Sequence, residues 1–298
     1  MKPNKILHIF GLFVAGFLTS TSAFAAEETI SFQVDGRKVV GTFNLPDGTE
    51  MPPVVLLLHG FSGSRDELKT PAVPEGIFAH TASAFAEKGI ASLRIDFMGS
   101  GDSDGSYADT TLQAELADAL AALDYIAARK DVAADKISIV GWSMGGAVAS
   151  MTAGATEHPL ASVTLWEAGA NMYASMALFF GTDALKTAFA EPADKEYELA
   201  LPWGGTIKLK GTFFRSLAAT DPVAGIVPFK GPLLVTSGTN DTVVFPQSET
   251  AQVFLDYHDG PEELWVRPMD HVFNAFQDDV TVNEMIGKTA DFILEASK

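Results

Sequence analysis

A serine between two glycines is the residue of this sequence best placed to act as a nucleophile. An apolar run, Ile137–Val140, leads into Gly141-Trp142-Ser143-Met144-Gly145, and a stretch of small residues with helical character follows. A strand, a tight turn and a helix in this order leave the serine hydroxyl exposed, because the flanking glycines make room for a strained turn. The hydroxyl then lies near the positive end of the new helix. We therefore predict that Ser143 is a nucleophile.

A serine hydroxyl is a weak nucleophile unless a base removes its proton during the attack. Five histidines follow residue 25: His59, His80, His158, His258 and His271. His271 follows the predicted last strand, in a loop from which it can return to the serine. His59 directly precedes Gly60, where main-chain donors are expected, and the others fall in a helix pattern or in solvated turns. The pattern predicts His271 as the base.

The base needs an acidic partner that orients it and stabilises its positive form. Asp241 follows the predicted strand 232–237, which gives the chain order serine, aspartate, histidine of hydrolases with a nucleophile elbow. Glu167 is a rival, because it ends the strand that follows the nucleophile strand. We predict Asp241 as the acid and keep Glu167 as the alternative.

An attacked carbonyl also needs donors for the negative charge that develops on its oxygen. The main-chain N–H of Met144, directly after the nucleophile, is one candidate. The second is the N–H of Phe61, since His59-Gly60 would direct it inward from the end of the run Val54–Leu58.

All of these candidates lie just beyond predicted strands, and the strands alternate with helices. Strands are expected at 29–34, 37–43, 54–58, 90–95, 137–140, 161–166, 232–237 and 263–267, and helices at 77–88, 112–129, 247–255 and 281–296. This alternation predicts an α/β fold whose mostly parallel sheet is covered by helices on both faces.

The alternation stops between residues 169 and 219, after the sixth strand. This segment is rich in methionine and aromatic residues, and a long insertion of this kind is usually functional. We expect a cap over the strand ends, in which Trp203 and Phe214 contact the substrate together with Trp142 and Glu167. The alternative is that the aromatic residues form the cap's own small core.

The first 25 residues have the features of an export signal. Two lysines precede the apolar run Ile6–Leu18, and Ala23-Phe24-Ala25 fits the rule for a cleavage site. The run is too short for an ordinary membrane span. The sequence therefore predicts a signal peptide at 1–25, one domain at 26–298, and a periplasmic or secreted protein that is not stably inserted in a membrane.

Composition excludes several classes of function. The net charge of −18 repels phosphate backbones, so we expect no nucleic-acid partner. The sequence has no cysteine, which excludes disulfides and cysteine-bound zinc. No other cluster has metal-ligand spacing, and the loop 96–105 lacks the pattern of a phosphate-binding loop. We expect neither a metal nor a cofactor.

These motifs together resemble the α/β-hydrolase superfamily, and most closely its bacterial feruloyl and cinnamoyl esterases. The likeness is carried by His59-Gly60-Phe61, the loop 96–105, Gly141–Gly146, Gly238–Val244, Asp270-His271 and the cap segment 209–215. The chain departs from those esterases at Trp142 and Met144, where they usually have Gly-His-Ser-Gln-Gly, and at Trp166-Glu167-Ala168.

The resemblance implies a serine hydrolase of carboxylic esters, acting on a small-molecule ester through an acyl-enzyme. General carboxylesterases, monoglyceride-lipase-like esterases and serine aminopeptidases of the S33 type share most of these motifs. An aminopeptidase would need an acid for the substrate amine, for which Glu167 or Glu191 is a candidate. A binding protein without activity is the remaining alternative, and the complete triad argues against it. The sequence predicts no oligomeric state.

Overall fold

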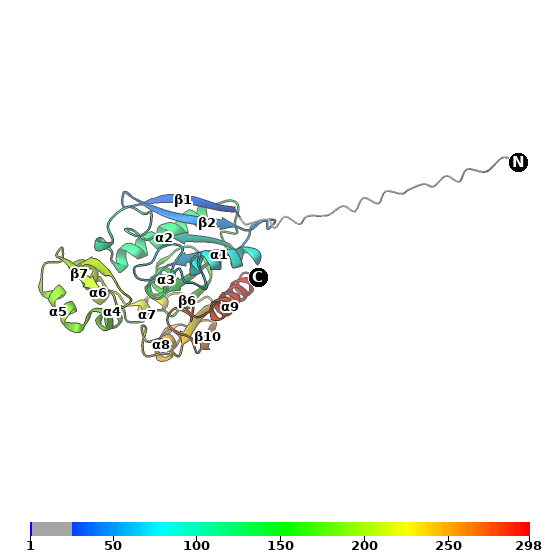
Figure 1. The fold of residues 1–298 in the computed structure, drawn as a ribbon. Coiled ribbons are helices and arrows are strands. Elements are labelled where there is room, and N and C mark those ends of the chain that lie inside the picture. Colours follow the sequence, from blue (N-terminus) through cyan, green and yellow to red (C-terminus); the bar gives the residue numbers. More distant parts are fainter. Residues whose placement is uncertain (2–25) are drawn as a thin grey trace.

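The computed structural model describes Met1 and residues 26–298 (Figure 1). Apart from Met1, the predicted signal peptide lies outside the described residues. Within the part of the chain that the structure describes, no helix is both long and apolar enough to cross a membrane.

Eight strands form one sheet in the order β1-β2-β4-β3-β5-β6-β9-β10. Their bounds are β1 (Ala26–Val34), β2 (Arg37–Leu45), β3 (Val54–Leu58), β4 (Ala91–Ile95), β5 (Ile137–Trp142), β6 (Leu160–Trp166), β9 (Leu233–Gly238) and β10 (Glu262–Arg267). The hairpin β1–β2 and the pair β2–β4 are antiparallel, and every other neighbouring pair is parallel. The predicted fold, a mostly parallel sheet between helices, is confirmed.

Helices cover both faces of this sheet. They are α1 (Ile77–Glu87), α2 (Leu112–Ala128), α3 (Met144–Ala155), α7 (Pro222–Ile226), α8 (Glu249–Tyr257) and α9 (Val280–Ala296). Apolar residues of α1 and α9 share one buried cluster, whereas those of α2, α3 and α8 share the cluster on the other face. The apolar run of strand β3 is continuous because both faces of this strand are buried. Val55 and Leu57 join the first cluster, and Val54, Leu56 and Leu58 join the second.

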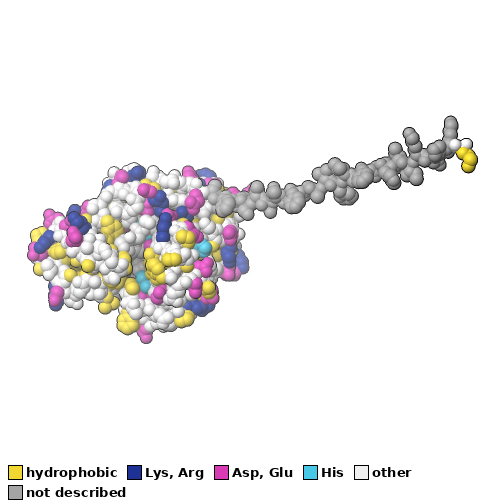
Figure 2. Space-filling model, in the orientation of Figure 1, with side chains coloured by type: hydrophobic (Ala, Val, Ile, Leu, Met, Phe, Trp, Pro, Cys, Tyr) yellow, Lys and Arg dark blue, Asp and Glu magenta, His cyan; other side chains and the backbone are white. Residues whose placement is uncertain are grey.

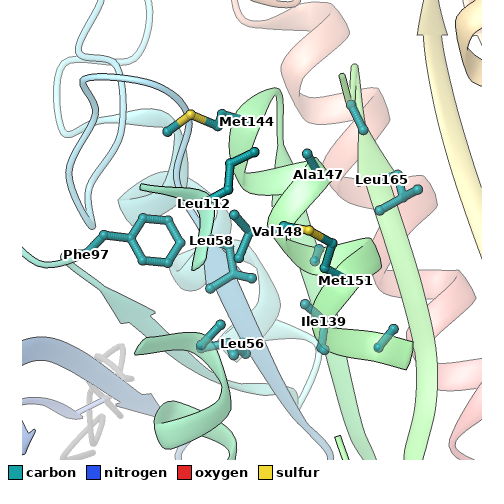
Figure 3. Close-up of a cluster of buried hydrophobic side chains, with 14 of the residues drawn as sticks. Leu56, Leu58, Phe97, Leu112, Ile139, Met144, Ala147, Val148, Met151 and Leu165 are labelled. Carbon is teal, nitrogen blue, oxygen red and sulfur yellow. The ribbon is translucent and has the colours of Figure 1, made fainter. Parts of the chain in front are cut away.

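Helix α3 packs on the strands that carry the site. Figure 3 shows Ala147, Val148 and Met151 of this helix beside Leu58 of β3 and Ile139 of β5. The helix comes this close because Gly145 and Gly146 in its first turn have no side chains. A Cβ at Gly145 would lie 2.1 Å from the main-chain oxygen of Leu58, so only glycine fits there.

Residues 169–219 form a separate lobe, the cap, which lies at the left of Figure 1. It contains α4 (Met172–Phe180), α5 (Thr182–Ala190), β7 (Glu196–Ala200), β8 (Thr206–Lys210) and α6 (Gly211–Ala219). Strands β7 and β8 form an antiparallel hairpin of their own, apart from the main sheet. The sequence pattern did not predict this hairpin.

Helix α3 holds the chain on both sides of the cap. The N–H of Gly169 donates to the main-chain oxygen of Ser143 (3.2 Å), at the start of this helix. Beyond the cap, the Ser150 hydroxyl donates to the main-chain oxygen of Pro222 (2.9 Å).

Candidate active site

Ser143 lies at the turn between β5 and α3, in a backbone conformation that is rare for a residue with a side chain. Its φ is 56° and its ψ is −116°. A Cβ at Gly141 would lie 2.2 Å from the oxygen of Gly145, so a side chain there would not fit against the new helix. The strain is the one expected of a serine held out at a strand-to-helix turn.

The structure brings the three predicted members of the triad together. Nε2 of His271 lies 3.0 Å from Oγ of Ser143, and its Nδ1 lies 2.8 Å from Oδ2 of Asp241. The other oxygen of Asp241 accepts hydrogen bonds from the N–H groups of Val243 (2.7 Å) and Val244 (3.0 Å). Burial alone would raise the pKa of Asp241, but the hydrogen bond and charge of His271 and these two N–H groups lower it. Asp241 is therefore an ionised partner for the histidine.

The two predicted oxyanion donors belong to segments that lie next to the serine. Met144 begins α3, and its N–H donates no hydrogen bond to the rest of the described chain. The N–H of Phe61 is equally free there, while its neighbours are held: Gly60 donates to Glu67 and Ser62 to the Tyr107 hydroxyl (2.6 Å). A Cβ at Gly60 would lie 3.5 Å from Cβ of Ser143, which places this loop directly against the nucleophile. Two free donors beside the serine can receive a developing oxyanion.

Glu67 holds this loop in place, and no sequence motif pointed to it. Its Oε2 accepts a hydrogen bond from the N–H of Gly60 at 2.7 Å. Burial raises the pKa of Glu67 to about 8, although that N–H and the N–H of Leu68 favour its ionised form. Nothing in the local pattern distinguishes it from an ordinary surface glutamate, because its role depends on how the loop folds back.

His59 supports the same loop from inside the protein. Its Nδ1 lies 2.9 Å from the main-chain oxygen of Gly60, and its Nε2 accepts from the N–H of Phe97 (3.2 Å). Burial lowers the pKa of His59 to about 4. The ring is therefore neutral at physiological pH, and both of its nitrogens are used in structural hydrogen bonds.

Trp142 was expected to contact the substrate, and the structure gives it another place. Its side chain is buried, and the indole Nε1 donates to the main-chain oxygen of His271 (3.1 Å). The indole and imidazole ring centres are 5.3 Å apart. Trp142 therefore supports the loop of the base, and the prediction of a substrate contact is wrong for this residue.

Glu167 does not contact the base, and it does not line an opening. Its exposed fraction is 0%, and its Oε2 accepts from the N–H of Gly238 (2.9 Å) and from Nε2 of Gln247 (3.3 Å). Nδ1 of His271 points to Asp241 instead. The predicted substrate contact is therefore corrected, and Glu167 is also unavailable to hold the amine of a peptide substrate.

The two cap residues chosen from the sequence differ in environment. Phe214 is 1% exposed and packs among Phe180, Tyr197 and Phe213, so it belongs to the cap's own core and the predicted contact is wrong. Trp203 is 56% exposed and meets the ring of Phe179 edge to face at 5.4 Å.

Trp203 lines a groove of about 610 Å³ between the cap hairpin and the loops of the main domain. Its other walls include Ser62, Tyr107, Leu201 and Ile207. Figure 2 shows hydrophobic side chains gathered in patches among charged ones on one face of the molecule. Since Ser62 follows Phe61 directly, the groove begins beside the predicted oxyanion loop.

Known proteins share this architecture. Residues 53–200 match the family described as alpha/beta hydrolase fold. The chain has the α/β-hydrolase fold. The fold that the resemblance implied is thus confirmed.

Relatives of similar sequence align over only part of their length. The Bacillus subtilis (strain 168) protein YtaP, provisionally named a hydrolase, is 34% identical over 143 residues. That match covers 42% of this chain and 48% of YtaP, so it spans about half the length of that relative.

Solved structures align over nearly the whole fold. Est1E from Butyrivibrio proteoclasticus, solved with ferulic acid bound, superposes with a TM-score of 0.69 at 22% identity, over 90% of this chain and 98% of Est1E. The Pyrococcus furiosus esterase Pf2001 superposes with a TM-score of 0.66 at 19% identity, over 96% of this chain and 98% of the esterase. At such identities the likeness shows the fold alone.

Proposed function

We propose that this protein is a serine hydrolase of carboxylic esters that works through an acyl-enzyme. The observation that carries the proposal is the hydrogen-bonded series of Ser143 Oγ, His271 and Asp241, with distances of 3.0 and 2.8 Å. A serine in contact with a base, and a base oriented by a carboxylate, is the arrangement that activates a hydroxyl for attack on a carbonyl.

Each residue then has a defined role. His271 Nε2 takes the proton of Ser143 as Oγ attacks the ester carbon, and the N–H groups of Phe61 and Met144 stabilise the oxyanion. His271 returns that proton to the leaving alcohol, which leaves the acyl group on Ser143. A water molecule, activated by the same histidine, hydrolyses this acyl-enzyme.

Esters of hydroxycinnamic acids are the substrate class we propose. Aromatic rings continue from Phe61, beside the serine, to Phe179 (ring centres 6.5 Å apart) and from there to the exposed Trp203. Flat aromatic walls suit a planar acyl group, because stacking adds about 0.5–1.5 kcal/mol to the burial of area. The superposition with Est1E, which was solved with ferulic acid, supports testing this class first.

Labelling with a fluorophosphonate tests the chemistry separately from the substrate. The wild-type protein should be labelled rapidly, the Ser143→Ala variant should not be labelled, and the His271→Ala variant should be labelled about 10⁴-fold more slowly. Equal labelling of the wild type and Ser143→Ala would refute the proposed nucleophile.

A panel of substrates then tests specificity. We expect hydrolysis of methyl ferulate to exceed that of p-nitrophenyl butyrate, a long-chain monoglyceride and an amino-acid amide, compared by kcat/KM. A preference for alkanoyl esters would favour a general carboxylesterase, and a preference for the amide would favour an aminopeptidase.

Export is proposed on the sequence of residues 1–25 alone. Expression of the full chain in a Gram-negative host, followed by N-terminal sequencing of the periplasmic and culture fractions, tests it. A mature chain that begins near Ala26 is the expected result, and a full-length chain confined to the cytoplasm would contradict it.

A further inference from the structure

A second carboxyl group lies behind the catalytic aspartate. Glu167 follows β6 directly, its φ is 45°, and its side chain is fully buried. It packs under the loop that begins at Gly238 and carries Asp241, and the two carboxyl groups are within hydrogen-bonding contact of each other. Asp241 in turn contacts His271 (2.8 Å). The order of groups is therefore serine, histidine, aspartate, glutamate.

Two ionised carboxylates cannot share this place without a cation. Within residues 26–298, no lysine or arginine forms an ion pair with Glu167 or Asp241, and the neighbouring charge that acts on Glu167 is that of Asp241. Burial, together with the charge of Asp241 and the hydrogen bond to it, raises the pKa of Glu167 well above its usual range, while the pKa of Asp241 is lowered. These directions favour a neutral Glu167 beside an ionised Asp241.

The hydrogen bonds also indicate which oxygen carries this proton. Oε2 of Glu167 already accepts from the N–H of Gly238 (2.9 Å) and from Gln247 (3.3 Å). Oε1 has only a long contact with the Thr236 hydroxyl (3.4 Å). Oε1 is therefore the oxygen with a free position for a proton.

We propose that Glu167 is a positioning residue, a neutral carboxylic acid that donates a hydrogen bond to the Asp241 carboxylate and thereby limits how firmly His271 holds a proton. The proposal rests on the serine-hydrolase mechanism given above. A donor to Asp241 draws negative charge away from the oxygen that faces His271, so the imidazolium is less stabilised and the histidine is a free base at lower pH. Glu167 would thus extend activity toward acidic conditions.

Two substitutions of Glu167 separate donation from charge. Glu167→Gln keeps a donor toward Asp241 but cannot ionise, whereas Glu167→Met keeps the volume and removes the donor. Ser162→Ala, on the same strand, removes a buried hydrogen bond to Ser138 (2.9 Å) that is distant from the triad, and it serves as the control for stability.

The rate of fluorophosphonate labelling, measured from about pH 4.5 to 9, reports the protonation of the base without requiring a particular ester. The acidic limb of this profile is the pH range in which the labelling rate rises with pH. We expect the acidic limb of Glu167→Gln to match that of the wild type, and that of Glu167→Met to move about half a unit to one unit upward in pH. Ser162→Ala should lower Tm and leave the limb in place. An unmoved limb in Glu167→Met, or a limb moved equally in both Glu167 variants, would overturn the proposal.

A stability measurement decides the matter if Glu167→Met does not fold. Because the pKa of Glu167 is raised in the folded state, the wild type should lose unfolding free energy as pH rises above about 4.5, the ordinary value. Glu167→Gln should show no such loss, so its unfolding free energy relative to that of the wild type should increase from about pH 5 to 9. A constant difference would show that Glu167 is ionised in the folded protein.

The same experiments separate this proposal from the proposed function. If the wild type is labelled but hydrolyses no ester, the substrate proposal fails and the comparison of limbs still stands. If the wild type is not labelled at all, the serine mechanism itself fails, and the role of Glu167 fails with it.

Discussion

The indole Nε1 of Trp142 donates a hydrogen bond to the main-chain oxygen of His271, 3.1 Å away. The residue directly before Ser143 thereby holds the loop that carries His271. Both this contact and their own hydrogen bond hold His271 beside Ser143. Trp142 therefore positions the site without reacting with a substrate.

Trp142→Phe should keep the aromatic packing and lose only this hydrogen bond. We expect kcat/KM to fall about tenfold or more with a small change in Tm, because a slightly misplaced base lowers the rate steeply. The kinetics of acylation by p-nitrophenyl acetate measure the loss. Trp265→Phe is the matched control, since this buried tryptophan of β10 packs against Arg267. A loss of equal size in the control would contradict the supporting role.

Asp241→Asn should lower kcat by about 10⁴, because the amide favours the wrong tautomer of His271. Combined with His271→Ala, it should add little further loss, since the residues act as one unit. Single-turnover measurements on the two single variants and the double variant give the comparison. Additive losses would show that Asp241 acts independently of the histidine.

Gly60→Ala should impair the oxyanion loop. The added Cβ would lie 3.1 Å from the Trp142 ring, so the ring or the loop carrying the N–H of Phe61 must move by a few tenths of an ångström. We expect kcat to fall about 10- to 100-fold, less than or comparable to the loss of one oxyanion donor. Gly287→Ala in α9 is the control, because a Cβ there meets nothing within 4 Å and should stabilise the helix by about 0.5–1 kcal/mol.

Glu67→Gln should make stability less dependent on pH. Burial raises the pKa of Glu67 to about 8 in the folded protein. In the unfolded chain Glu67 ionises near its ordinary pKa of 4.5. The wild type therefore loses unfolding free energy as pH rises from about 4.5 to about 8, and the variant does not. Urea unfolding at several pH values should show a gap that widens across this window and then stays constant. A gap that does not change with pH would contradict the prediction.

Trp203→Ala and Phe214→Ala should differ in what they impair. Phe214 is core, so its truncation should lower Tm and reduce kcat/KM for methyl ferulate and p-nitrophenyl acetate alike. Trp203 lines the groove, so its truncation should reduce kcat/KM for methyl ferulate about three- to tenfold and spare the acetate, whose acyl group does not reach it. Equal losses on the two esters in Trp203→Ala would remove the tryptophan from the substrate site.

Local patterns were sufficient for the parts of the fold that are set locally. The strand β3 has the bounds that its apolar run predicts, and the triad residues follow their strands as the chain order requires. Helix α8 begins at Glu249, two residues later than the pattern indicates. Such small displacements at helix ends are usual, because the terminal turns are only partly hydrogen-bonded.

Contacts between distant segments could not be derived in this way. Glu67 and Tyr107 hold the oxyanion loop, but each is an unremarkable residue in its own segment. Glu167 attracted attention because it ends a strand, yet its position behind Asp241 depends on how the loop after β9 folds over it. The burial that distinguishes Phe214 from Trp203 likewise depends on the cap hairpin, which has no strong strand pattern.

The attachment of the cap to α3 has a consequence for how this protein can change over time. The cap is one continuous stretch, and α3 holds the chain before it at Ser143 and beyond it at Pro222. Recombination could therefore replace the whole stretch while the strands, the serine turn and the loops of Asp241 and His271 keep their order. A descendant of this protein can thus acquire a new substrate specificity in a single exchange and keep Ser143, Asp241 and His271 unchanged.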